Sequence, residues 1–225
     1  MGNAAAARNA SEAVNHTKEN LLDAAEVLFA EHGVAGASLR AITARAGVNL
    51  AAAHYHFGSK EALLRAVMAR RLRPINARRL ALLDAYEAQP AAERSLVELL
   101  RAFVDPVVRF GRELPDEGRA FAQLCGRAMN APDDVLRSIL IDELGEVVRR
   151  FLPAFARALP ALPRRELLWR VHFTVGAMAH AMAGRRLIEA VSGGLCDTRD
   201  VDGTVERLVR FLAAGFAAPA AEDSP

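Results

Sequence analysis

The chain has 225 residues, of which 52% are hydrophobic and 25% charged, and a net charge of +2 excludes a polycationic protein. Ala and Leu dominate, with two Tyr, one Trp and few β-branched runs, which favours an all-α fold with a sizeable core. No apolar run reaches the ~18 residues of a membrane span, and no secretory signal begins the chain, so we expect a cytoplasmic protein with no membrane partner.

The N-terminal part begins with residues 1–14, which are small and polar and are expected to lack regular structure. Thr17 then provides a cap for a helix over about 18–32, and Gly33 and Gly36 end it. The apolar side chains of this helix recur at helical spacing. They are Leu21, Leu22, Ala25, Leu28 and Phe29.

Residues 38–64 predict two short helices joined by a glycine turn. Ser38 caps a helix over 39–46, and Gly47 stands where that helix must stop. Asn49 caps a second helix over 50–56. Two short helices with a Gly-containing turn form a helix-turn-helix, which places its second helix in the major groove of DNA.

A polar and aromatic cluster follows the second helix. Its far end carries His54, Tyr55, His56 and Phe57, and the next helix begins at Lys60. Phenolic, imidazole and ammonium groups are frequent contacts to the phosphate backbone. Residues 15–73 also carry a net charge of +3, whereas the rest of the chain carries −1, which fits a DNA-binding head on a nearly neutral body.

The remaining chain predicts long helices. The helix that begins at Lys60 continues to about residue 88, with a bend or break at Pro74. Further helices are expected over 92–112, 116–129, 132–158, 164–190 and 201–217. We therefore predict a DNA-binding domain over 15–62 and a second, helical domain over 63–218.

The run from Thr17 to Leu64 resembles the N-terminal DNA-binding domain of the TetR (tetracycline-repressor) family. One departure is His54, where the family usually has Tyr; the tyrosine here is Tyr55. The variant over 49–60 is similar to a subgroup that includes fatty-acid-responsive regulators. The matching residues are Thr17-Lys18-Glu19, Ala24-Ala25-Glu26, Leu28-Phe29-Ala30-Glu31, Gly33, Ser38-Leu39-Arg40, Ile42, Ala46-Gly47-Val48, His56-Phe57 and Ser59-Lys60-Glu61-Ala62-Leu63.

The helix-turn-helix supplies the candidate DNA contacts. Arg40 and the first residues of the second helix are candidates for base edges: Asn49, Leu50, Ala51 and Ala52. The candidates for phosphate contacts are Ser38, Tyr55, His56 and Lys60, and His54 could serve either role.

The last two long helices carry apolar stripes and small residues. An intramolecular core would explain them, but the resemblance implies a four-helix seam between two copies of the chain, which we favour. The predicted interface residues are Gly176, Ala179, Ala183, Leu208, Leu212 and Phe216.

The middle helices are rich in aromatic residues. Ordinary core packing explains any one of them, but together they predict an adaptable cavity for an apolar effector, which the subgroup resemblance identifies as a fatty acid or acyl thioester. The predicted pocket residues are Phe103, Phe110, Phe121, Met129, Phe151, Phe155, Trp169 and Phe173.

The sequence contains no catalytic or cofactor motif, so we expect no enzyme, no cofactor and no metal site. His54 and His56 point in different directions on a helix, and Cys125 and Cys196 lack metal-like spacing. The resulting hypothesis is a homodimeric, ligand-responsive repressor that binds a near-palindrome in double-stranded DNA. The alternative is an all-α small-molecule or lipid-binding protein whose helix-turn-helix is structural.

Overall fold

A computed structural model of the chain describes residues 2–113, 120–126, 134–183 and 185–220, with side chains over 14–110, 120–126, 134–182 and 187–220. The described residues form helices and short loops with no strand, so the predicted all-α class is confirmed. They divide into two compact units. The first comprises Met1–Arg71 and Gln123–Glu143, and the second comprises Leu72–Ala122 and Leu144–Pro225.

The first unit begins with α1 (Gly2–Gly36), in which the backbone of Gly33 departs from helical geometry with a φ of 74°. The helix therefore starts well before Lys18, and the expectation that residues 1–14 lack regular structure is wrong. Four consecutive alanines at 4–7 explain the difference, because Ala has the highest intrinsic helix propensity.

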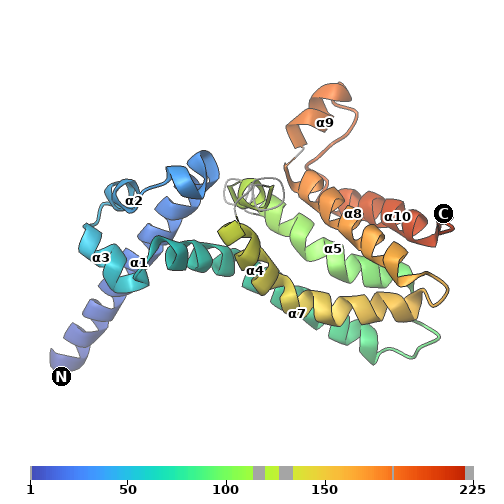
Figure 1. Cartoon of the computed structure of the whole chain (residues 1–225), viewed down its shortest axis with the longest axis horizontal. Helices are drawn as coiled ribbons and strands as arrows, with labels where there is room; N and C mark the ends of the chain where they lie inside the picture. The colour runs from blue at the N-terminus through green and yellow to red at the C-terminus, as the bar shows by residue number, and fades with distance from the viewer. Residues whose placement is uncertain (1, 114–119, 127–133, 184, 221–225) are drawn as a thin grey trace. The chain divides into compact units, whose positions relative to one another are not determined.

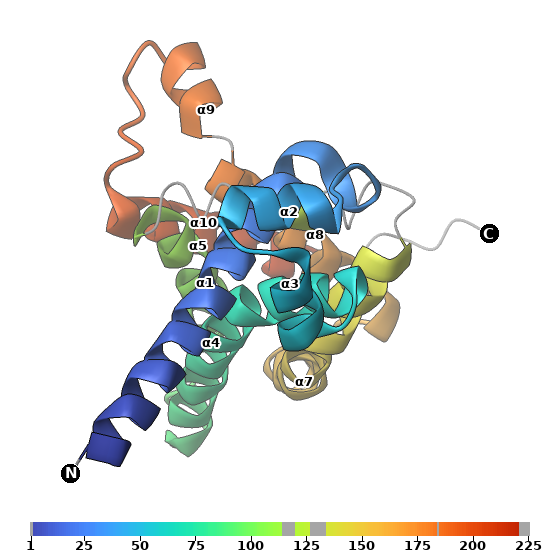
Figure 2. The same cartoon turned by 90° about the vertical axis from the view of Figure 1, so that its left-hand side faces the viewer.

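The helices α2 (Leu39–Ala46) and α3 (Leu50–Phe57) contact each other and both contact α1 (Figure 1 and Figure 2). Ile42 of α2 and Ala53 of α3 are buried, as is Phe29 of α1. The start of α4 (Lys60–Ala88) adds the buried Leu63 and Leu64. A compact core therefore fixes the orientation of the two short helices.

The long helix α4 belongs to both units, and the division falls between Arg71 and Leu72. Pro74 follows inside the helix, and α4 continues through it rather than ending there. Proline has no N–H, so the carbonyl of Arg70 lacks its usual partner four residues later.

The second unit is built around α5 (Leu96–Glu113), which contacts both α8 (Arg164–Ala183) and α10 (Val201–Ala217) (Figure 1). The C-terminal part of α7 (Asp134–Ala158) contributes Phe151 and Phe155 to the same core. Long amphipathic helices thus bury their apolar stripes against one another.

The region predicted as one helix over 164–190 contains two helices. After α8, a short helix α9 (Arg185–Val191) leads into a loop before α10. Of the predicted helix over 116–129, residues 120–126 are helical, and the rest of that range lies outside the described residues.

Candidate DNA interface

The turn between α2 and α3 is fixed by local hydrogen bonds. The Ser38 hydroxyl accepts a hydrogen bond from the amide of Ala41 at 3.1 Å, which caps α2. At the other end Gly47 adopts a φ of 68°, and its amide donates to the carbonyl of Ala44. Only glycine takes this left-handed conformation at no steric cost, so the turn angle follows from the residue type.

The second helix presents one face to solvent. The Asn49 side chain caps it by accepting from the amide of Ala52 at 2.9 Å. Within α3, Ala53 is the buried residue, whereas Ala51 and Tyr55 are exposed. A capped helix that buries one face and exposes Ala51 and Tyr55 on another leaves the exposed face available for a groove.

His54 has a structural role that the sequence did not reveal. Its Nδ1 lies 3.0 Å from the carbonyl oxygen of Gly58, the residue that ends α3. Because a carbonyl can only accept, Nδ1 must carry the proton, and Nε2 of the neutral ring is then an acceptor. The ring stabilises the C-terminus of α3 while it remains exposed.

Tyr55 and His56 form the edge of the candidate surface. The Tyr55 side chain is 79% exposed, and its ring meets the His56 ring edge to face with centroids 5.2 Å apart. Such contact restricts both rings, so the phenolic hydroxyl is presented from a restrained position.

Lys60 connects the start of α4 to the segment before α2. Its Nζ donates to the carbonyl of Val34 at 2.8 Å and to that of Ala37 at 3.2 Å. The half-buried ammonium therefore holds two carbonyl groups, a structural role that its position in the sequence does not indicate. An ammonium has three N–H donors, so these two bonds do not use its full capacity.

A buried carboxylate joins α1 to α4 within the first unit. Glu26 accepts from Arg70 at 2.6 Å and from Arg71 at 2.9 Å, and Arg70 also donates to Asp23. Burial opposes the charge on Arg70, but the hydrogen bonds to Glu26 and Asp23 outweigh it and raise the pKa of Arg70. We call Glu26, Arg70 and Arg71 the ionic clamp. Its members lie far apart in sequence, so residue spacing did not identify the clamp.

Three of the predicted pocket residues form packed core in the second unit. Phe103 lies 5.0 Å from Phe151 and 5.8 Å from Phe155, measured between ring centroids. Phe216 stacks on Phe155 at 5.4 Å. All four rings are buried, and each packs against at least one other ring of the group. In this structure the predicted pocket residues therefore pack on one another.

The other predicted pocket residues lie elsewhere. Phe110 and Phe121 pack edge to face at 5.4 Å, and Met129 lies outside the described residues. Trp169 and Phe173 are 50% and 63% exposed on α8, where their rings stack. Within a single chain these two side chains therefore face solvent rather than the packed core.

The predicted dimer residues separate into two groups. Gly176 is exposed, and Ala179 is half-buried beside it on α8; the side chain of Ala183 lies outside the described residues. By contrast, Leu212 and Phe216 are buried within the chain, which corrects their assignment to an interface. The apolar stripe of α10 faces α5 and α8, and Leu208 packs half-buried against the same core.

A buried cation also lies in the second unit. Arg79 is 4% exposed, and its Nε donates to the carbonyl of Phe103 at 2.8 Å. Its guanidinium carbon lies 4.5 Å from the centroid of the Phe103 ring. The aromatic face and the carbonyl both stabilise positive charge in this apolar core.

Two protein-family models match this chain. A family model described as "Bacterial regulatory proteins, tetR family" matches residues 21–67. A second, "Tetracyclin repressor-like, C-terminal domain", matches residues 101–215. Among the described residues, none of the helices is long and apolar enough to cross a membrane.

The relatives in sequence match over the N-terminal region. The chain is 36% identical over 69 residues to the HTH-type transcriptional regulator SrpR of Pseudomonas putida, which is 31% of this chain and 32% of that protein. It has the same identity over 69 residues to the uncharacterized regulator TtgW, also of Pseudomonas putida, which is 52% of that protein. The matches thus span about a third and about half of those relatives.

The relatives in structure match over most of the chain. A Clostridium perfringens protein described as a fatty acid metabolism regulator has a TM-score of 0.62 at 19% identity, over 89% of this chain and 100% of that one. The fatty acid degradation regulator FadR of Bacillus halodurans has a TM-score of 0.59 at 17% identity, over 90% and 97%. At such identities these likenesses show the fold. The two family models show that the chain belongs to the TetR family of bacterial transcriptional regulators.

Proposed function

We propose that the chain is a dimeric repressor that leaves a near-palindromic operator when it binds a small apolar effector. The observation that carries the DNA-binding part is the exposure of α3, which is capped at both ends and buried through Ala53. Membership of a family of transcriptional regulators argues against a lipid-binding protein with a merely structural helix-turn-helix. It also argues against an enzyme. A regulator of this kind acts in the cytoplasm, where its DNA lies.

The contacts that we propose follow the geometry of the helix-turn-helix. Arg40, at the start of α2, and Asn49, Leu50, Ala51 and Ala52, at the start of α3, reach base edges. Ala51 and Ala52 offer apolar contact, for instance to a thymine methyl group. At the edges of this surface, Ser38, Tyr55, His56 and Lys60 bind phosphates, and Nε2 of His54 remains an acceptor.

The test is fluorescence anisotropy with the DNA upstream of the chain's own gene. We expect specific binding at ~10⁻⁸ M or tighter, with affinity that falls as salt rises. Ala51→Glu places a carboxylate on the exposed face of α3 and should abolish this binding. The matched control is Ala156→Glu, which changes an exposed alanine of α7 in the second unit. Equal binding by both variants would contradict the assignment of α3.

For the dimer, we propose that the exposed face of α8 forms a seam with a second copy. Trp169 and Phe173 stack on this face, and Gly176 follows one turn later. A Cβ atom added at Gly176 would meet nothing within 4 Å, so the chain itself does not fill this place. An exposed aromatic patch next to a small residue is typical of an interface, and members of the family are dimeric.

For the effector, we propose a fatty acid or acyl thioester. The subgroup resemblance over 49–60 and the fatty acid regulators with the same fold support this class. Because the four phenylalanine rings of the second unit are in contact, an acyl chain would have to separate them to enter. An effector that binds only the folded chain stabilises the fold. By linkage, the effector weakens the affinity for DNA by the same factor by which DNA weakens the affinity for the effector.

The effector test combines a thermal shift with DNA release. A medium- or long-chain acyl compound should raise the melting temperature and lower the anisotropy of the protein–DNA complex. A polar cationic compound that does both, while acyl chains do neither, would contradict the proposed class.

A further inference from the structure

The segment from Leu187 to Arg199, which we call the arm, carries four solvent-exposed aliphatic side chains. Figure 1 shows α9 projecting away from α8 and α10. Leu195 is 91% exposed and Val191 is 76% exposed, and Leu187 and Ile188 are exposed as well. Four exposed aliphatic side chains on one short segment are unusual for a surface, because each leaves apolar area in water.

Hydrogen bonds nevertheless give the arm a defined conformation. The amide of Gly194 donates to the carbonyl of Glu189 at 3.0 Å, and the amide of Cys196 donates to the Ser192 hydroxyl at 3.1 Å. The Thr198 hydroxyl also donates to the Glu189 carboxylate. These bonds hold the backbone that carries the aliphatic side chains, which suits a surface that packs against something else.

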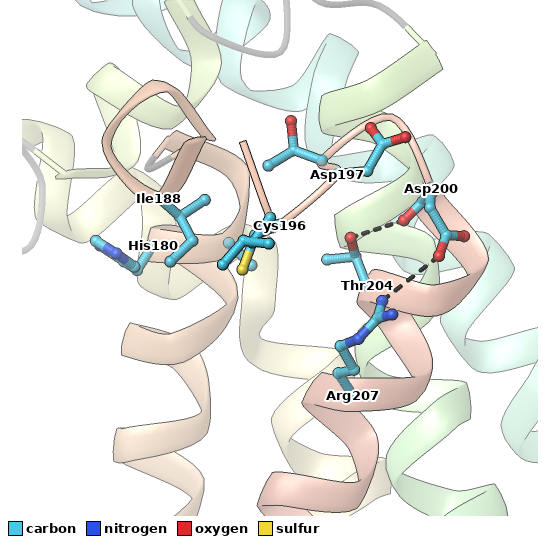
Figure 3. A pocket seen from close by; sticks show the side chains of 10 residues that line it. His180, Ile188, Cys196, Asp197, Asp200, Thr204 and Arg207 are labelled. Carbon is cyan, nitrogen blue, oxygen red and sulfur yellow. Dashed lines mark hydrogen bonds and ion pairs between the residues drawn. The ribbon is translucent and has the colours of Figure 1, made fainter. Parts of the chain in front are cut away.

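The arm does not close against its own chain. A cavity of about 400 Å³ lies between the arm, the end of α8 and the start of α10 (Figure 3). His180 and Ile188 lie on one side of it and Asp200 with Arg207 on the other, as Figure 3 shows. Asp200 caps α10 through the amide of Gly203 at 2.8 Å and also receives Arg207. Asp200 and Arg207 are thus already paired within the chain, whereas the aliphatic side chains of the arm remain exposed.

The position of the arm indicates what covers it. His180, at the edge of the cavity, lies four residues after Gly176 on α8, and Gly176 lies three after Phe173. Residues at this spacing share one face of a helix, and all three are exposed. The exposed face of α8 therefore runs from the proposed seam directly to the arm.

We propose that the arm packs on a second copy of this chain, beyond the seam of α8, and that each cavity is closed by the partner. This inference rests on the proposed dimer. In a twofold-symmetric dimer the arm contact occurs twice, so it adds two apolar patches to the interface.

The first test is the dimer dissociation constant, measured by sedimentation velocity over a concentration series. The double variant Val191→Ser, Leu195→Ser should raise it at least 100-fold, because four aliphatic side chains per dimer are lost and each 1.4 kcal/mol corresponds to tenfold. Both residues are exposed, so circular dichroism should show an unchanged fold. The matched control is Ile141→Ser, which removes an exposed aliphatic side chain from α7.

The second test uses the exposed Cys196 as a probe within the arm. In a Cys125→Ser background, its thiol should react at least tenfold more slowly with a thiol reagent above the dimer dissociation constant than below it. The variant Gly176→Trp, which blocks the seam, should restore the fast rate at all concentrations.

The outcomes separate the two proposals. A wild-type chain that stays monomeric at every concentration would overturn the proposed dimer and the arm contact with it. A dimer that Gly176→Trp disrupts, but in which the arm variant changes the dissociation constant less than threefold and Cys196 reacts equally fast, would overturn the arm contact alone.

Discussion

The helix-turn-helix and the helical bundle of the second unit differ in how far their structure follows from local sequence. In the first, side chains next to each turn fix the geometry: Ser38 and Asn49 cap helices that begin one residue later, and Gly47 sets the turn. In the second, long amphipathic helices carry stripes that fit either a core or an interface. The DNA contacts that we propose for the first unit are exposed residues near short-range turns, whereas the dimer seam that we propose for the second depends on which stripe faces inward.

The largest expected effect is on the free energy of unfolding, and it distinguishes the buried from the exposed aromatic residues of the second unit. Phe155→Ala should lower the free energy of unfolding by about 3–5 kcal/mol, because the buried ring contacts Phe103 and Phe216 and its loss leaves a cavity. Phe173→Ala should change it by less than about 0.5 kcal/mol in the monomer, because this ring is 63% exposed. Urea denaturation of both variants in the monomeric Gly176→Trp background measures the difference.

If the two variants lost similar stability, the distinction between a packed phenylalanine core and an exposed face of α8 would fail. A loss of dimer affinity in Phe173→Ala without a loss of monomer stability would instead support the proposed seam.

The ionic clamp gives the next largest effect and tests whether the first unit depends on more than its caps. Glu26→Gln should lower the free energy of unfolding by about 3 kcal/mol, because two half-buried arginines then lose their shared carboxylate. Glu19 also pairs with Arg70 but is exposed, so Glu19→Gln should cost at most about 1 kcal/mol. Thermal unfolding followed by circular dichroism compares them, and equal shifts would contradict the role given to burial.

The sequence predicted those features that neighbouring residues determine. The helix over 39–46 was predicted to the residue, and that over 50–56 to within one residue, because caps and a glycine mark their ends. Contacts between distant residues were not accessible in this way: Glu26 meets Arg70 across 44 residues, and Lys60 meets Val34 across 26. No pattern in a single sequence indicates such pairs.

The same limit explains the corrections in the second unit. The stripe of α10 includes Leu212 and Phe216, and its spacing is equally suited to an intramolecular core and to a dimer seam. Only the packing of α5 and α8 decides between them, and it places both side chains inside. The division between α8 and α9 was not predicted, because residues 164–190 contain no proline and were expected to form one helix before the loop at 192–194.

A smaller effect concerns the base-reading role of Arg40, which is exposed at the start of α2. Arg40→Ala should relax the preference at one base position in each half-site, at a cost of about 1–3 kcal/mol for each lost bidentate contact. Anisotropy titrations against operators with single base substitutions measure this. A uniform loss against every operator would show instead that Arg40 contacts the phosphate backbone.

The smallest effect concerns Lys60, where structural and DNA-binding roles meet. Its ammonium already donates to the carbonyls of Val34 and Ala37. We propose that the third N–H reaches a phosphate. Lys60→Ala should then weaken binding to all DNA sequences alike and reduce the slope of log affinity against log salt by about 2 per dimer, since each phosphate contact contributes roughly 0.9.

The matched control is Ser59→Ala, which removes the cap that the Ser59 hydroxyl provides for the amide of Ala62 at 3.0 Å but leaves the charge in place. This variant should cost about 1 kcal/mol of stability and leave the salt slope unchanged. Suppose that Lys60→Ala also leaves the slope unchanged while it lowers the melting temperature. The ammonium would then serve only to join α4 to the segment before α2, and the phosphate contacts at this edge would come from Tyr55 and His56.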